Sequence, residues 1–243
     1  MSFSSEETIL KLQKENKKLI EENESLKTRM NIPSNKGEQI TADHLQLVLE
    51  DLKRNGVISK YKVYNNLSID GIENNSPRQI DHLIITTRGI FVIETKHWKG
   101  DIYYNFSEKD LKKYNLEGLK EYLYDEEAKN YKTFILDSNN YNLVFNSYGH
   151  PFKQVLTTAK AVKEKFSLDF VNPIIYFNYC GDYKLYIGNN EKYVSCASSK
   201  NELSNTIYKK MTTDNKFNRY YSDDEINEIS QRVERPFKLN NND

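Results

Sequence analysis

The sequence has few residues that could hold a small fold together covalently or through a structural metal ion. Only two cysteines, Cys180 and Cys196, occur among its 243 residues. Their spacing matches neither the ligand pattern of a zinc site nor a disulfide framework. The fold must therefore be stabilised by a hydrophobic core, and the two thiols fit a protein of a reducing compartment.

Long apolar segments are also missing. No stretch approaches the roughly eighteen consecutive apolar residues that a membrane-spanning helix needs, and the N-terminal residues lack the apolar core of a signal peptide. We therefore expect a cytoplasmic protein with no membrane partner.

A net charge of one sign is absent as well, because 35 basic and 35 acidic residues cancel. A neutral chain lacks the long-range field of proteins that coat nucleic acid non-specifically. Any contact with nucleic acid must then come from a local basic patch or from a bound metal ion. The hydrophobic residues, 37% of the chain, suffice for a folded core and argue against global disorder.

The first pattern that is present is a heptad repeat within residues 1–33, which Pro33 ends. Leucines fill the d positions, which favours two strands, and two a positions hold asparagines, whose amides can meet in a parallel pair. The predicted dimerisation residues are Ile9, Leu12, Asn16, Leu19, Asn23, Leu26 and Met30. We predict a coiled coil that makes the chain a homodimer. The alternatives are a single amphipathic helix lying on the main domain, or a frayed arm.

The remaining patterns predict one α/β domain over residues 37–235, with an insertion at about 107–148 and a disordered tail over 236–243. The expected helices cover 38–54, 151–166, 200–211 and 222–233, and the expected strands lie within 57–69, 80–87, 90–96, 101–105 and 174–179. We further expect a helix over 111–129, a hairpin turning at 137–140 and a hairpin-like stretch over 184–194. The predicted fold is a mixed sheet of four or five strands flanked by helices and preceded by the coiled-coil helix.

Three charged residues lie at the ends of an otherwise apolar hairpin: Asp81, Glu94 and Lys96. If Arg88 and Gly89 are the two central residues of its turn, Asp81 faces Lys96 across the strands. Glu94 precedes Lys96 by two residues and therefore shares its face. The three side chains should converge at one end of the hairpin, although a slip of one residue would separate them.

This convergence has a chemical meaning. Two carboxylates one strand spacing apart, about 5 Å, form an oxygen-ligand pair suited to Mg²⁺. A bound divalent ion can activate water and neutralise charge on a phosphate. Lys96 could orient the attacking water or stabilise the phosphorus centre, and Glu38 could add a further oxygen ligand.

These residues resemble a known family. Asp81, twelve intervening residues and Glu94-Thr95-Lys96 resemble the signature of the PD-(D/E)XK nuclease superfamily. More specifically, the chain is similar to the NERD (nuclease-related) domain over about residues 37–177, in the motifs Gly37-Glu38, Gln79-Ile80-Asp81 and Glu94-Thr95-Lys96-x-Trp98-x-Gly100. The segment His150-Pro151-Phe152-Lys153-Gln154 is similar to that family's Asn-Pro-x-x-Gln motif, with His150 where asparagine is usual.

The resemblance implies a restriction-endonuclease-like fold and a Mg²⁺- or Mn²⁺-dependent nuclease acting on DNA. By this likeness Asp81, Glu94 and the backbone carbonyl of Thr95 would bind the metal ion, and Lys96 would be the catalytic lysine. Glu38 would be the helix-borne acid and Gln154 an accessory residue. The implied pathways are anti-phage defence and DNA processing or repair.

Several roles remain open from the sequence. The predicted contacts to nucleic acid are Arg78, Lys99, Lys153 and Lys160, each of which could instead be a surface charge. His82 and His97 should point away from the carboxylates, and Trp98 should pack rather than stack on a base. The alternative functions are a binding module without cleavage, an RNA- or tRNA-cleaving enzyme, and a scaffold that recruits a helicase or other defence partner.

Overall fold

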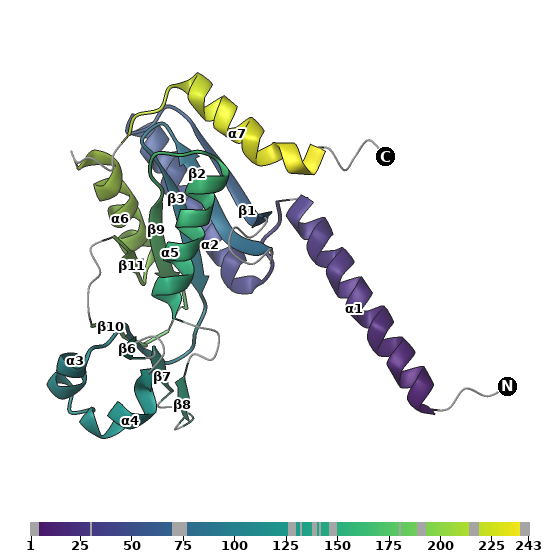
Figure 1. Ribbon diagram of the computed structural model, residues 1–243. Helices are drawn as coiled ribbons and strands as arrows, with labels where there is room; N and C mark the ends of the chain where they lie inside the picture. Colours follow the sequence, from purple (N-terminus) through teal and green to yellow (C-terminus); the bar gives the residue numbers. More distant parts are fainter. Residues whose placement is uncertain are drawn as a thin grey trace.

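The computed structural model shows a long N-terminal helix, an α/β domain around a five-stranded sheet, and a smaller lobe built on a second sheet (Figure 1). It describes residues 5–29, 31–69, 77–125, 130–131, 133–137, 140, 142–145, 150–179, 181–188, 193–213 and 219–238. Cys180, Met30 and part of the predicted tail lie outside the described residues. Among the described helices, none has the length and apolar character that crossing a bilayer requires.

The predicted N-terminal helix is present as α1 (Ser5–Arg29), which projects away from the domain (Figure 1). The chain leaves the helix through Asn31, whose φ of 57° cannot continue it, and reaches Pro33 two residues later. The leucines at the d positions lie exposed on this helix. The helix itself is confirmed, and its pairing with a second copy stays a prediction.

The central sheet is mixed, as predicted. Its strands lie in the order β1 (Tyr61–Ile69), β2 (Arg78–Thr86), β3 (Gly89–Lys96), β9 (Asn172–Phe177) and β11 (Ser195–Ala197). Strand β2 runs antiparallel to both of its neighbours, β1 and β3, and β3, β9 and β11 run parallel. The carboxyl ends of β3 and β9 therefore meet at one edge of the sheet, where open α/β folds bind their ligands.

Four helices cover the two faces of this sheet and bury its apolar side chains. On one face lie α2 (Lys36–Arg54) and α6 (Lys200–Thr212), and on the other lie α5 (Pro151–Lys165) and α7 (Asp223–Lys238). Residues of β3 alternate between the two cores, Phe91 and Ile93 packing on the α2 side and Ile90 and Val92 on the α5 side. This three-layer arrangement confirms the α/β fold class. Helix α7 runs to Lys238, beyond the expected domain end at 235.

The smaller lobe combines the insertion with two strands from outside it. Its sheet has the order β10 (Leu185–Ile187), β4 (Asp101–Tyr104), β7 (Phe134–Asp137) and β8 (Asn142–Phe145). The predicted hairpin is confirmed, with β7 and β8 antiparallel around the turn. Strand β4 joins the two lobes, because Tyr104 packs into the main core and Tyr103 into the aromatic core of the smaller lobe.

Two predictions for this region were wrong. The helix expected over 111–129 is broken into α3 (Glu108–Lys113), the 3₁₀ turn η1 (Glu117–Leu119) and α4 (Lys120–Leu123), followed by the short strands β5 (Tyr124–Asp125) and β6 (Asn130–Tyr131). Asn115 stops the first helix with a φ of 57°. The described part of the stretch over 184–194 forms no hairpin: β10 pairs with β4, and the following strand β11 pairs with β9 in the other sheet.

Candidate functional site

The β2–β3 hairpin turns one residue earlier than predicted. Thr86 pairs with Gly89, so Thr87 and Arg88 are the central residues of the turn. The Thr86 hydroxyl donates to the Gly89 carbonyl oxygen (2.8 Å) and accepts from the Arg88 amide (3.1 Å), which holds the turn in this register. The predicted pairing of Asp81 with Lys96 is therefore wrong.

The corrected register still places the three charged residues on one face. Each residue now faces a partner two positions earlier in β3, and a shift of two leaves the faces unchanged. Continuing the observed register beyond its last pair, His82 with Ile93, brings Asp81 opposite Glu94. The Asp81 carboxylate Oδ2 accepts a hydrogen bond from the backbone amide of Thr95 (2.8 Å), which fixes it beside the end of β3.

Lys96 links this hairpin to helix α5. Its Nζ donates to Glu94 Oε1 (2.7 Å) and to Gln154 Oε1 (3.0 Å). The Lys96 and Glu94 side chains are only 14% and 13% exposed, so the ion pair is largely shielded from solvent. The ammonium group is thus held between a carboxylate and an amide rather than extending into water.

The electrostatics of the site centre on Asp81. Burial raises the pKa of Asp81 well above its ordinary value, and the neighbouring carboxylates of Glu94 and Glu38 raise it further. The Thr95 amide and the Lys96 ammonium oppose this shift without cancelling it. Three acidic groups therefore repel one another here, an arrangement that a bound cation would relieve.

Glu38 reaches the site from the first turn of α2, but its carboxylate is already engaged. Ser34 donates to it through its amide (2.8 Å) and its hydroxyl (2.5 Å), and the Asn35 side chain donates to Oε1 (2.6 Å). Asn35 in turn caps the helix by accepting from the Glu38 amide (3.1 Å). In this arrangement Glu38 acts on Asp81 through its charge.

Helix α5 begins at the motif in which histidine replaces the usual asparagine. His150 is the N-cap residue, and its Nδ1 accepts from the Phe152 amide (3.2 Å). An asparagine would cap the helix in the same way. The substitution therefore preserves the start of α5, which carries Gln154 to Lys96.

Two motif glycines are required by close approaches of the backbone. A Cβ on Gly37 would lie 2.5 Å from the Cβ of His97, so glycine lets the start of α2 pack against the end of β3. A Cβ on Gly100 would lie 2.8 Å from the Leu136 carbonyl oxygen, and its φ is 117°. Trp98, between them, packs against Phe177 as predicted, with ring centroids 5.9 Å apart.

A chain of buried hydrogen bonds runs behind the charged residues, on the opposite face of the hairpin. His82 Nε2 contacts the Thr95 hydroxyl (3.2 Å), which donates to the Thr41 hydroxyl of α2 (3.0 Å). Asn178, just after β9, donates to the same Thr41 oxygen (2.7 Å) and to the Gly37 carbonyl (2.5 Å). We call this set the polar network.

The polar network extends at both ends. At one end, His82 Nδ1 contacts the Asn65 side chain of β1 (2.7 Å). At the other end, Asn178 Oδ1 contacts His97 Nδ1 (2.7 Å). His82 and His97 thus point away from the carboxylates, as predicted. No partner could be predicted for either histidine from the sequence, and Thr41 and Asn178 were missed because nothing in their spacing marks them as neighbours.

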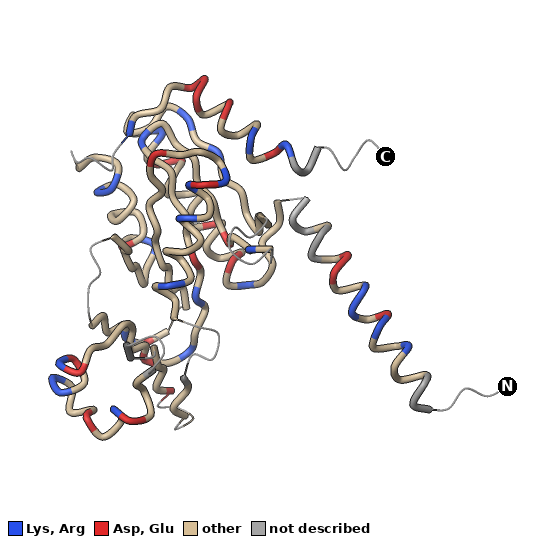
Figure 2. The backbone as a smooth tube through the Cα atoms, in the orientation of Figure 1, with Lys and Arg blue, Asp and Glu red and all other residues tan. Residues whose placement is uncertain are grey.

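The four predicted nucleic-acid contacts lie on β2, on the segment after β3 and on α5. Lys153 and Lys160 are exposed on α5, and Lys99 is exposed after β3. Arg78, at the start of β2, is half-buried and its guanidinium lies 3.4 Å from the Thr158 hydroxyl of α5. Lys and Arg are interspersed with acidic residues over both lobes (Figure 2).

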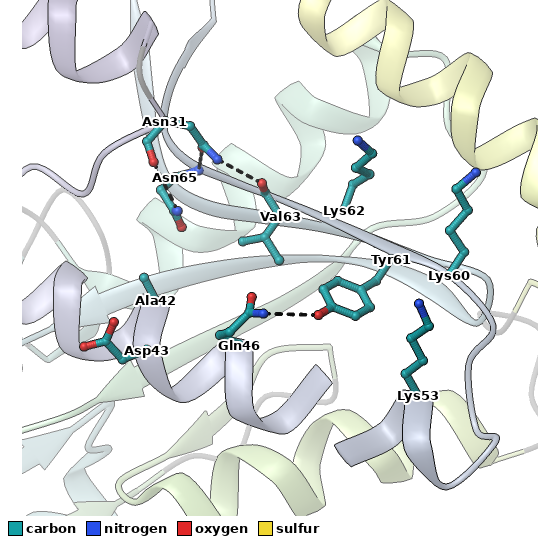
Figure 3. Close-up of a pocket in the computed structure, with 10 residues that line it drawn as sticks. All are labelled: Asn31, Ala42, Asp43, Gln46, Lys53, Lys60, Tyr61, Lys62, Val63 and Asn65. Carbon is teal, nitrogen blue, oxygen red and sulfur yellow. Dashed lines mark hydrogen bonds between the residues drawn. The ribbon is translucent and has the colours of Figure 1, made fainter. Parts of the chain in front are cut away.

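A polar pocket of about 600 Å³ lies elsewhere, between α2 and β1 (Figure 3). It is lined by Asn31, Ala42, Asp43, Gln46, Lys53, Lys60, Tyr61, Lys62, Val63 and Asn65. None of the predicted catalytic or nucleic-acid-binding residues is among them. The pocket is therefore separate from the charged site.

The residues of the charged site could supply only part of the coordination shell of a divalent cation. Within the described residues, no group of three or more His, Cys, Asp and Glu side chains is arranged to bind a metal ion. Asp81 and Glu94 nevertheless offer the one or two carboxylates that Mg²⁺ commonly takes from a protein, and water and substrate phosphate usually complete its shell. The mutual repulsion around Asp81 is the observation that favours a cation there.

Comparison with known proteins supports the resemblance seen in the sequence. Residues 33–126 match the family model of the nuclease-related domain, NERD. The match covers less than half of the chain, from the start of α2 to β5, and includes Glu38, Asp81, Glu94 and Lys96 but not Gln154. No curated protein and no solved structure matches the chain.

Proposed function

We propose that this chain, whose residues 33–126 match the nuclease-related domain, hydrolyses phosphodiester bonds in DNA with the help of Mg²⁺ or Mn²⁺. The single observation that carries the proposal is the placement of Asp81, Glu94 and Lys96 on one face, at the carboxyl end of β3. The family match supports a nuclease-related function, and the geometry supplies acidic and cationic groups where that function needs them.

Asp81 and Glu94 would hold the cation, and the Thr95 carbonyl is the predicted third ligand from the protein. When bound, the ion would lower the pKa of a coordinated water and neutralise charge on the phosphate. The Thr95 amide keeps Asp81 oriented by its hydrogen bond to Oδ2. Glu38 adds negative charge behind Asp81 while its own oxygens stay bound by Ser34 and Asn35.

Lys96 is the residue best placed to contact the reacting phosphate. Its ammonium has three donors, of which two are directed at Glu94 and Gln154. The third donor can reach a phosphate oxygen or orient a water molecule next to it. Gln154 and Glu94 restrict the rotation of the long side chain, which lowers the entropy cost of placing the charge.

DNA as the polymer follows from the family likeness rather than from any base-reading group. The exposed lysines of α5, Lys153 and Lys160, begin one residue before Gln154 and extend along the same helix. Contacts between such lysines and phosphates position a duplex without reading its sequence. We expect binding to weaken as salt rises.

The test is cleavage of supercoiled plasmid with Mg²⁺ or Mn²⁺, with EDTA as the metal-free control. Lys96→Ala and Asp81→Asn should each reduce cleavage at least a hundredfold. The matched controls Lys109→Ala, in α3, and Asp224→Asn, in α7, change exposed residues of the same type and should cleave like the parent. Metal-dependent cleavage that survives both site substitutions would show that the activity belongs to another site or a contaminant.

Parallel reactions on RNA and on DNA of the same sequence separate the proposal from an RNA-cleaving enzyme. A gel-shift measurement in Ca²⁺ separates it from a binding module, because such a module would retain the DNA in every metal without cutting it. Co-purification of a larger protein with an inactive chain would instead indicate the scaffold alternative.

A further inference from the structure

Helix α1 presents an apolar surface that its own domain leaves uncovered. Its large apolar side chains are more than half exposed: Ile9 54%, Leu10 70%, Leu12 59%, Leu19 59%, Ile20 57% and Leu26 55%. The helix projects from the domain, so no other part of the described chain covers these residues (Figure 1). An isolated helix of this length is marginal in water, and an uncovered stripe of this kind indicates a missing partner.

We propose that the partner is a second copy of the same chain, whose α1 pairs with this one in parallel and in register. Four of the exposed side chains, Ile9, Leu12, Leu19 and Leu26, follow the spacing of a and d positions and form one seam. Asn16 and Asn23 occupy the other a positions within α1 and are exposed as well. This proposal concerns assembly and goes beyond the proposed nuclease function.

The two asparagines decide between a second copy and other partners, and between the two directions of pairing. In a parallel pair in register, each residue of the seam meets its own counterpart, so the Asn16 amides can bond to each other and so can the Asn23 amides. In an antiparallel pair, Asn16 would face Leu19 and Asn23 would face Leu12 of the other helix. All four amides of the pair would then be buried against leucine without a hydrogen-bond partner.

A tight connection joins this rod to the domain. The side-chain amide of Asn31 donates to the Val63 carbonyl (3.2 Å) and accepts from the Asn65 backbone amide, and the Asn65 side chain donates to the Asn31 carbonyl (3.3 Å). The Asn31 amide thus takes the place of a neighbouring strand along the outer side of β1, at the rim of the polar pocket (Figure 3).

This anchor has a consequence for the assembly. Asn31 follows the end of α1 by two residues, so the chain is tied to the edge of the sheet just after the helix. In a parallel pair of α1 helices both domains lie at the same end of the coiled coil, and each is attached to it through its β1 edge. Two charged sites are then carried by one particle. If the proposed function holds, such a particle can cut both strands of a duplex without dissociating.

The first test of the assembly is the molar mass of the full chain, measured by sedimentation equilibrium at roughly 1–50 µM without metal or DNA. The parent should have the mass of a dimer. Leu19→Glu, at the centre of the seam, should shift the chain to the monomer. Leu10→Glu is the matched control, because Leu10 is the most exposed apolar residue of α1 and lies off the seam. Circular dichroism of both variants checks that the domain stays folded.

Direction is tested by oxidative cross-linking at the end of the seam. In the parallel pair the two copies of residue 9 are adjacent, whereas in the antiparallel pair they lie about 25 Å apart along the rod. Ile9→Cys should therefore form a disulfide-linked dimer within minutes, while Leu10→Cys and the parent, which both retain Cys180 and Cys196, should not.

Each outcome is decisive for the assembly and independent of cleavage. A monomeric parent, or a Leu19→Glu chain that stays dimeric, would overturn the pairing. A dimer in which Ile9→Cys fails to cross-link would overturn its direction, and a trimer or tetramer would overturn the two-stranded form. An inactive nuclease would change none of these results.

Discussion

The polar network behind the charged site gives the sharpest prediction about what holds that site in place. Thr41 is fully buried, and its hydroxyl has three contacts: it donates to the Gly37 carbonyl (3.2 Å) and lies within hydrogen-bond distance of the Thr95 hydroxyl and the Asn178 amide. Thr41→Val replaces this hydroxyl by a methyl group and so keeps the shape of the side chain. The substitution therefore tests the hydrogen bonds apart from packing.

The expected cost follows from the groups that would lose a partner. The Thr95 hydroxyl keeps His82 and Asn178 keeps Gly37, so each loses one bond rather than all of them. A buried polar group that loses its partner costs about 1–3 kcal/mol. We expect Thr41→Val to lower the free energy of unfolding by about 2 kcal/mol. Thr95→Val should cost a similar amount, and the double variant less than the sum, because the two hydroxyls bond to each other.

The measurement is urea unfolding of the metal-free chain, with Thr157→Val as the matched control on the exposed side of α5. The control should change the free energy of unfolding by less than about 0.5 kcal/mol. The affinity for Mn²⁺, measured by calorimetry, should fall in Thr95→Val, because this residue lies between Glu94 and Lys96. Equal stabilities of Thr41→Val and Thr157→Val would refute the reasoning. So would additive costs in the double variant.

Three further predictions concern single residues. Asp81→Asn removes a carboxylate that its surroundings destabilise, so it should raise the free energy of unfolding by roughly 1 kcal/mol. The same variant should abolish Mn²⁺ binding in calorimetry. A loss of stability would contradict this prediction. Burial lowers the pKa of His82 from 6.5 to about 3. Between these two pH values the unfolded chain binds a proton at His82 that the folded chain does not, so the free energy of unfolding falls as the pH drops from about 6.5 toward 3. In acid titrations His82→Gln should reduce that slope by about 1.4 kcal/mol per pH unit relative to the parent, and identical slopes would exclude a buried neutral histidine. Gly37→Ala should destabilise the chain by about 1–3 kcal/mol because its Cβ meets His97, whereas Gly118→Ala, with open space around it, should not; equal melting curves would show that the approach is loose.

The site could be anticipated from the sequence because a strand has a period of two. The predicted turn was displaced by one residue, which moved every pairing by two positions. Asp81 therefore faces Glu94 instead of Lys96, but the parity of the pairing and hence the common face survived. Only an error that changed parity would have separated the charges. The elements of the main domain were predictable for a similar reason, since its strands and helices are long and strongly periodic.

The smaller lobe could not be read in this way. The charged stretch over 111–129 has helical composition, yet Asn115 adopts a left-handed conformation and breaks it. Its apolar residues then fold inward, and Leu111 and Leu123 pack with Phe134 in the aromatic core. The pairing of strands β10 and β11 could not be predicted either, because each strand is three residues long and its sheet is decided by partners far away in the sequence.

The polar network also gives a physical reason for the form of the Glu-x-Lys motif. Glu94 and Lys96 face the reactive side, so Thr95 between them must face the opposite side, where it bonds to the Thr41 hydroxyl of α2. On the neighbouring strand Asp81 is followed by His82, which reaches the same hydroxyl of Thr95. Thr95 thus fastens β3 to α2, and His82 fastens β2 to its neighbouring strands β1 and β3. The charges repel one another and lie partly buried, so without this fastening the strand ends could move apart to relieve the repulsion. The residue between the two named positions of the motif is therefore part of what keeps the carboxylates close enough to share one cation.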